Sequence, residues 1–164
     1  MDTTQWFHDQ LLASADSFVW GSEQVPSARQ NIIPPDGLGE WTAARQVFHL
    51  GYYERTFALP HMRQWCGDAR PPTSGLNEDA IWKENQANVE RLVADFRKVR
   101  MEQVALLSKF NDNTWNTALE TVWGTVTLRW VVSKTYQHTM EHTSNILRIA
   151  LFWDTFTARQ KAKG

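Results

Sequence analysis

Residues 128–156 read LRWVVSKTYQHTMEHTSNILRIALFWDTF, and side chains suited to a protein interior recur along them every three or four positions. An α-helix places residues at this spacing on one face, so the stretch predicts one long amphipathic helix. Such a helix has to bury its inner face against other helices, which favours a helical bundle. The inner face carries Val131, Thr135, His138, His142, Asn145 and Ile149.

Three further helices are expected upstream of this one. The first covers residues 2–20; the second begins after Thr42, a good helix-capping residue, and continues to Phe57 before Pro60. The third is expected to be one helix of about thirty residues over 77–110, at a spacing of three or four that includes Asn85. Proline and glycine interrupt the chain at 21–39 and 67–75, and 111–127 is expected to be a loop with a short strand at 121–123. The pattern predicts an all-α four-helix bundle with long crossover connections.

Length and composition exclude several classes of protein. The 164 residues are expected to form one domain, 1–164. A net charge of −1 argues against a nucleic-acid-binding protein, which normally carries a basic face. The longest apolar run, 149–153, is too short for a membrane helix, and no basic residue precedes Arg29 as a secretory signal would require. The single cysteine, Cys66, excludes an intrachain disulfide. We therefore expect a cytoplasmic protein without a membrane partner.

The chain contains five histidines, and two of them point to a metal site. His138 and His142 are four residues apart on the long helix, so both rings project from one face and can converge on one divalent ion. For this pair alone, ordinary buried or half-exposed histidines are an equally good interpretation. A third ligand on another helix changes the balance, and His49 is the candidate because it shares the inward phase of the second helix. His8 and His61 lie nearer segment ends, where we expect solvated side chains.

Three neutral imidazoles from two helices would leave at least one metal position open, which is typical of a catalytic metal site. Zinc, nickel, iron and manganese are all compatible with this ligand set. Two glutamates are alternatives for a general base near the metal. Glu54 and Glu141 both have a helical phase that points away from the histidines, which favours a solvated face for Glu141. Arg45 and Arg129 are alternatives as receptors for an anionic substrate.

Two stretches resemble the DinB-like superfamily. Residues 39–50, GEWTAARQVFHL, resemble its second-helix signature, in which a tryptophan and a small capping residue precede a histidine followed by an aliphatic residue. Residues 123–130, WGTVTLRW, followed by His138, His142 and the pair 146–147, resemble its fourth helix. Where family members often have Arg-Gly-Gln after the last histidine, this chain has Thr-Ser-Asn at 143–145.

The resemblance implies an up-up-down-down four-helix bundle, a homodimer, and a divalent metal held by His49, His138 and His142. Zinc or nickel is the first expectation for the metal, with iron or manganese as alternatives. Bacillithiol- and mycothiol-dependent enzymes are among the family's members. The resulting hypothesis is a metal-dependent enzyme acting on a small molecule, either a transferase that uses a low-molecular-weight thiol or a small hydrolase. The alternative is a non-catalytic, dimeric bundle that binds a metal or another ligand.

Overall fold

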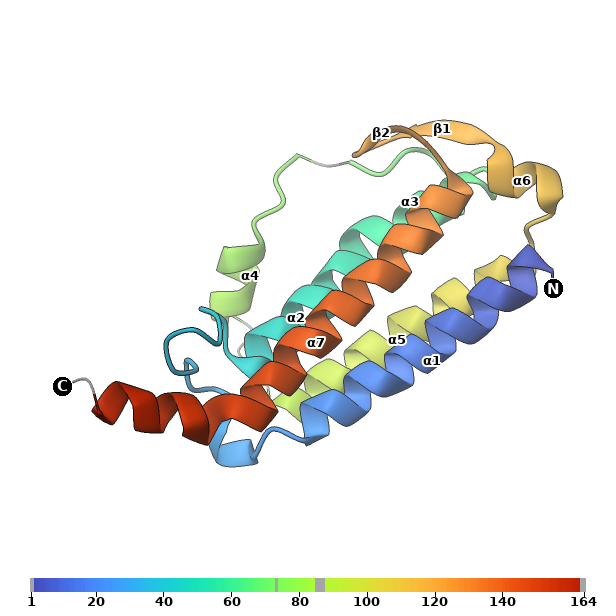
Figure 1. Ribbon diagram of the computed structural model, residues 1–164. Coiled ribbons are helices and arrows are strands. Elements are labelled where there is room, and N and C mark those ends of the chain that lie inside the picture. Colours follow the sequence, from blue (N-terminus) through green and yellow to red (C-terminus); the bar gives the residue numbers. More distant parts are fainter. Residues whose placement is uncertain (1, 73, 85–87, 163–164) are drawn as a thin grey trace.

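The computed structural model describes residues 2–72, 74–84 and 88–162, and it confirms the predicted four-helix bundle (Figure 1). The four long rods of the bundle are α1 (Thr3–Glu23), α2 (Ala43–Tyr53) with its continuation, α5 (Val89–Leu107) and α7 (Leu128–Lys161). The continuation of α2 is a π-helical turn, η2 (Glu54–Ala58), followed by α3 (Leu59–Gln64). The shorter elements are η1 (Ser27–Arg29), α4 (Glu78–Glu84), α6 (Asp112–Asn116), β1 (Ala118–Thr121) and β2 (Gly124–Thr127).

Each long helix begins at a polar side chain that accepts a hydrogen bond from a backbone N–H of its first turn. Asp2 does this for α1, Thr42 for α2, Asn88 for α5 and Thr127 for α7. These caps satisfy backbone donors that have no partner inside the helix. The expected cap of the second helix at Thr42 is therefore confirmed, with Thr42 Oγ1 3.0 Å from the N–H nitrogen of Arg45.

The helix directions follow from the lengths of the connections. α1 and α7 run one way and α2 and α5 the other, so the order along the chain is up, down, down, up rather than the expected up-up-down-down (Figure 1). The connection that contains α4 brings the chain back along the bundle, which allows α5 to run parallel to α2. The link from α5 to α7 stays at one end, where Trp115 Nε1 donates to Thr4 Oγ1 over 2.9 Å. α5 and α7 are therefore antiparallel.

The expectation of a single third helix was wrong. Its N-terminal part is the separate helix α4, and α5 starts anew at Val89; Asn85 lies outside the described residues. Asn88 is the reason for the new start. Its backbone is extended, with φ −65° and ψ 152°, and its side chain caps α5 through the N–H of Arg91. An asparagine in this role competes with helix continuation, a competition that apolar periodicity does not register.

Three other boundaries differ from expectation. The second helix does not stop before Pro60, because the wider π-helical turn η2 precedes it and Pro60 lies in the first turn of α3, where a missing N–H is tolerated. The short strand expected at 121–123 is a hairpin, in which Ala118–Thr121 pairs antiparallel with Gly124–Thr127. The last helix is longer than expected and ends at Lys161.

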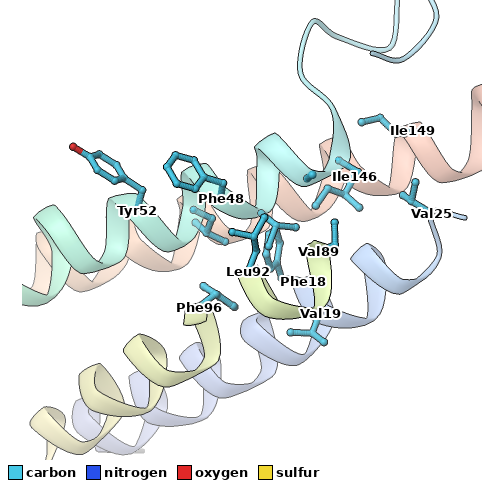
Figure 2. Packing of buried hydrophobic residues seen from close by; sticks show 14 of the residues in the cluster. Phe18, Val19, Val25, Phe48, Tyr52, Val89, Leu92, Phe96, Ile146 and Ile149 are labelled. Atoms are coloured by element: carbon cyan, nitrogen blue, oxygen red, sulfur yellow. The ribbon is translucent and has the colours of Figure 1, made fainter. Parts of the chain in front are cut away.

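The interior consists of two apolar clusters with a polar layer between them. Figure 2 shows the first cluster, in which Phe18 of α1, Phe48 of α2, Phe96 of α5 and Ile146 of α7 converge. The second surrounds Trp115 at the other end of the bundle. Within the described residues, no helix combines the length and the apolar character that crossing a membrane requires.

The polar layer is built around a fully buried ion pair. The Arg100 guanidinium binds both carboxylate oxygens of Glu54, and it also donates to Thr139 Oγ1 at 2.7 Å and to the Leu11 carbonyl at 2.9 Å. Exposure is 0% for Glu54 and 1% for Arg100. Burial raises the pKa of Glu54, and the Arg100 charge opposes this rise. The pair and its partners link η2, α5, α7 and α1, and the α7 partner, Thr139, is the residue that follows His138.

Candidate metal centre

The structure brings together the three histidines that the sequence singled out. His138 and His142 project from one face of α7, and His49 projects toward them from α2. His138 Nε2 lies 3.2 Å from His49 Nε2 and 3.0 Å from His142 Nε2. Two nitrogens that each lie about 2.1 Å from one ion are about 3.0–3.4 Å apart at angles between 90° and tetrahedral. Both distances fall in this range, and the ligand nitrogens of all three histidines lie within 4.8 Å of one another, so the cluster is compact enough to be a candidate site for one metal ion.

The other ring nitrogens fix the orientation of two of these histidines. His49 Nδ1 lies 2.9 and 3.0 Å from the two carboxylate oxygens of Glu78, and His142 Nδ1 lies 2.5 Å from Gln46 Oε1. Both partners are acceptors, so each Nδ1 carries the proton and each Nε2 presents a lone pair to the centre of the cluster. This is the tautomer that a metal ion requires. Among the described residues, buried His138 Nδ1 has no hydrogen-bond partner.

Burial keeps the histidines of α7 neutral. It lowers the pKa of His138 to about 3, and the charges of His142, His49 and Lys134 add to the effect. It lowers the pKa of His142 to about 4, with His49 contributing. Neutral imidazoles are the form that coordinates metals, so these two side chains need not lose a proton near pH 7 to act as ligands.

All three histidines line a wide pocket of about 460 Å³. Trp41 forms one wall, with its ring 4.9 Å from that of His49 and nearly parallel to that of His142 at 6.3 Å. A small molecule can therefore reach the histidines from solvent. The lining residues are Glu40, Trp41, Gln46, His49, His138, Glu141, His142 and Asn145.

The sequence interpretation missed two residues that support the site. They are Glu78, the first residue of α4, and Gln46 of α2, and neither is among the candidates that the sequence singles out. Local spacing could not indicate Glu78, because this residue is 29 positions from His49 in the chain and reaches it only where α4 packs against α2. Gln46 precedes His49 by three residues on the same helix. That spacing puts both side chains on one helix face, and it is the one feature of the sequence that indicates a role for Gln46 near the site.

Three other charged candidates lie in different surroundings. Arg45 is buried against Trp41, Phe48 and Trp82 and pairs with acidic residues of α4, so its charge is already neutralised. Glu54 faces Arg100 in the polar layer instead of the histidines. Glu141 is exposed, as expected, at the rim of the pocket.

The expectation of a solvated His61 was wrong, because the side chain is fully buried. Its Nδ1 donates to the Phe57 carbonyl over 2.7 Å, and its Nε2 accepts from the N–H of Val122 in the hairpin turn over 3.1 Å. Burial lowers the pKa of His61. Through these two hydrogen bonds His61 links the hairpin to α3. The role depends on a contact with the distant hairpin, which the local sequence does not specify.

His61 should make stability depend on pH. The unfolded chain protonates this histidine below about pH 6.5, whereas burial keeps it neutral in the fold. Its contribution is thus present above that pH and is lost on acidification. In urea titrations at pH 7 and pH 5, His61→Gln is expected to lose less free energy of unfolding between the two pH values than the unsubstituted chain. An equal loss in both would contradict this role; His8→Gln, at a half-exposed histidine, is the control.

Comparison with known proteins agrees with this architecture. No curated protein sequence matches the chain. Among solved structures, YfiT from Bacillus subtilis, described as a probable metal-dependent hydrolase with an unusual four-helix bundle topology, superposes with a TM-score of 0.75 at 15% identity, over 92% of this chain and 88% of YfiT. Mycothiol-dependent maleylpyruvate isomerase superposes with a TM-score of 0.71 at 14% identity, over 88% of this chain and 61% of the isomerase.

These two likenesses show a shared fold, and this chain corresponds to less than two thirds of the isomerase. The family itself is established by sequence. Residues 10–146, which reach from the first helix past both histidines of α7, match the DinB superfamily. This chain therefore belongs to the DinB superfamily.

Proposed function

We propose that this chain is a divalent-metal-dependent enzyme in which His49, His138 and His142 hold one metal ion. One observation carries the proposal: the ligand nitrogens of three histidines lie within 4.8 Å of one another, and all three residues line an open pocket. A closed structural site would surround its metal with four protein ligands. Among the described residues only three ligating groups converge here, so one side is free for a small molecule.

A divalent metal in this position would lower the pKa of a water or a thiol enough to supply a nucleophile near pH 7. The protein's own residues prepare the site for it. Gln46 and Glu78 hold the rings of His142 and His49 in the ligating tautomer, and Trp41 provides a flat apolar wall for a substrate. Zinc and nickel are the proposed metals, with iron and manganese as alternatives, because imidazole nitrogens suit all four.

Transfer to a low-molecular-weight thiol is the reaction we favour over hydrolysis. In it, the thiolate sulfur bonds to an electrophilic carbon of the substrate, and the leaving group departs with its electron pair. The sulfur has to come from outside the chain, because Cys66, its only cysteine, follows α3 and does not line the pocket. The structural likeness to a mycothiol-dependent enzyme supports this choice. The description of YfiT as a probable metal-dependent hydrolase supports the hydrolase alternative.

Cobalt(II) loaded in place of the natural metal tests the proposal, because its absorption reports directly on its ligands. We expect about one cobalt per chain, and a new sulfur-to-cobalt charge-transfer band when free cysteine is added as the thiol probe. Cobalt binding without that band, but with a spectrum that changes as water is replaced by acetate, would favour the hydrolase. A cobalt spectrum that responds to neither would favour the non-catalytic metal-binding alternative.

A homodimer and a single domain over 1–164 remain predictions. Light scattering on the purified chain measures the first directly. Limited proteolysis measures the second, because one domain should give one resistant core rather than two.

A further inference from the structure

α4 stands beside the bundle, outside its four long helices (Figure 1). None of its side chains is fully buried. Its attachment instead depends on a few contacts with α2, among them Trp82, whose ring lies 5.1 Å from that of Phe48. A helix held in this way has little apolar burial to keep it in place, so its polar contacts matter more than usual.

The first residue of α4 makes the contact that matters for the metal centre. The Glu78 carboxylate accepts from His49 Nδ1 and also binds the Arg45 guanidinium at 2.8 Å. The next residue, Asp79, binds the same guanidinium at 2.7 Å but has no contact with a histidine. Two neighbouring acids thus share one partner, and only one of them reaches the site.

We infer that Glu78 is a positioning residue for His49, and that metal binding and the docking of α4 on the bundle are one linked equilibrium. The inference rests on the proposed metal site. It adds that the site is complete only when α4 is docked, although α4 contributes none of the three ligands. Release of α4 removes the hydrogen-bond acceptor of His49 Nδ1 and so weakens metal binding. Loss of the metal in turn lowers the stability of the docked α4.

The physical argument is the one that applies to any ligating histidine. A carboxylate on Nδ1 fixes the ring orientation, holds the proton on Nδ1 and makes Nε2 a better donor to the metal. Removing such a partner lowers metal affinity by about 10–100-fold. Coupling between two equilibria is reciprocal, so a bound metal must stabilise the docked α4 by the same factor.

Zinc affinity measured by competition with a chromophoric chelator tests the first half of the inference. Glu78→Ala is expected to bind zinc about 10–100-fold more weakly than the unsubstituted chain. Asp79→Ala is the matched control: it loses an ion pair with the same arginine but no contact with His49, and its affinity should change by less than about threefold. Glu78→Gln keeps an oxygen that can accept from Nδ1 and should recover part of the lost affinity.

Hydrogen exchange of the peptide that covers residues 78–84 tests the second half without any assay of activity. Zinc is expected to slow this exchange by about 10–100-fold in the unsubstituted chain and in Asp79→Ala. In Glu78→Ala, zinc at a saturating concentration should leave the exchange rate of α4 nearly unchanged. The corresponding peptide of α6, at the other end of the bundle, should be insensitive to zinc in all three proteins.

The outcomes separate this inference from the proposed function. If the unsubstituted chain binds zinc but Glu78→Ala binds it as tightly as Asp79→Ala does, or if zinc does not protect α4, the linkage is wrong and the three-histidine site stands. If the unsubstituted chain binds no zinc, nickel, iron or manganese, the metal site and the linkage are both overturned.

Discussion

The His142→Ala variant is expected to bind zinc at least about 100-fold more weakly than the unsubstituted chain. Loss of a residue that only hydrogen-bonds to a ligating histidine costs less, about 10–100-fold. Among the described residues, His142 is one of only three ligating groups that cluster at this site, so its removal leaves two imidazoles in a site open to water. Elemental mass spectrometry after equilibration with zinc near the dissociation constant of the unsubstituted chain, followed by removal of free metal, measures the result.

Two controls separate loss of a ligand from loss of the fold. His8→Ala removes a half-exposed histidine of α1, far along the chain from the site, and should retain full zinc binding. His142→Gln keeps most of the side-chain volume, which covers the possibility that the alanine variant fails to fold. Zinc retained at the original affinity by a folded His142 variant would contradict the assignment of this histidine as a ligand.

The Arg100→Met variant is expected to lose about 3–5 kcal/mol of unfolding free energy, a large share of the roughly 5–15 kcal/mol that stabilises a typical domain. The Glu54 carboxylate is fully buried, and Arg100 is its only cationic partner among the described residues. Methionine occupies a similar volume but leaves that charge unpaired. Urea unfolding at pH 7 provides the measurement.

A surface ion pair offers the matched control. Arg63 lies 3.1 Å from Glu102, and both side chains are more than 40% exposed. Arg63→Met should therefore cost less than about 1 kcal/mol. A similar loss in both variants would show that the buried pair contributes no more than an exposed one.

Removing the second charge as well should restore most of the stability. In Glu54→Leu with Arg100→Met, no buried charge remains, and replacing a buried pair by apolar residues is often neutral. The hydroxyls that faced the arginine keep acceptors in their own helices, since Ser14 donates to the Leu11 carbonyl and Thr139 to the Thr135 carbonyl. A double variant as unstable as Arg100→Met would show that the unpaired charge is not the cause.

The same single variant has a predictable pH dependence. Burial raises the pKa of Glu54, and without Arg100 only the hydrogen bond from Thr139 opposes that rise. A carboxyl whose pKa is higher in the folded state contributes most at low pH and loses its contribution as pH rises. The stability deficit of Arg100→Met relative to the unsubstituted chain should therefore be smaller at pH 5 than at pH 7. A deficit that grows on acidification would contradict this account.

Local pattern was sufficient for the fold class and for the ligand candidates. Apolar spacing predicts the long helices, and the four-residue interval between His138 and His142 places two imidazoles on one face in any α-helix. The inward phase of His49 on a second helix could be read in the same way. Each of these properties depends on residues within a few turns of one another, and sequence specifies that range directly.

Tertiary contact alone decided the rest. The local sequence does not distinguish Glu78, which accepts a hydrogen bond from His49, from Asp79, which does not. The residues around Glu54 likewise do not indicate that Arg100, 46 positions later, will neutralise its charge. His61 is buried where the hairpin turn packs against it, and the helix directions depend on the connection that contains α4. The sequence by itself determined which helices form and which histidines share a face, since both depend on the helical repeat. Packing between distant segments determined the protonation, the support and the accessibility of the site, because charge and burial depend on every neighbour that the fold brings close.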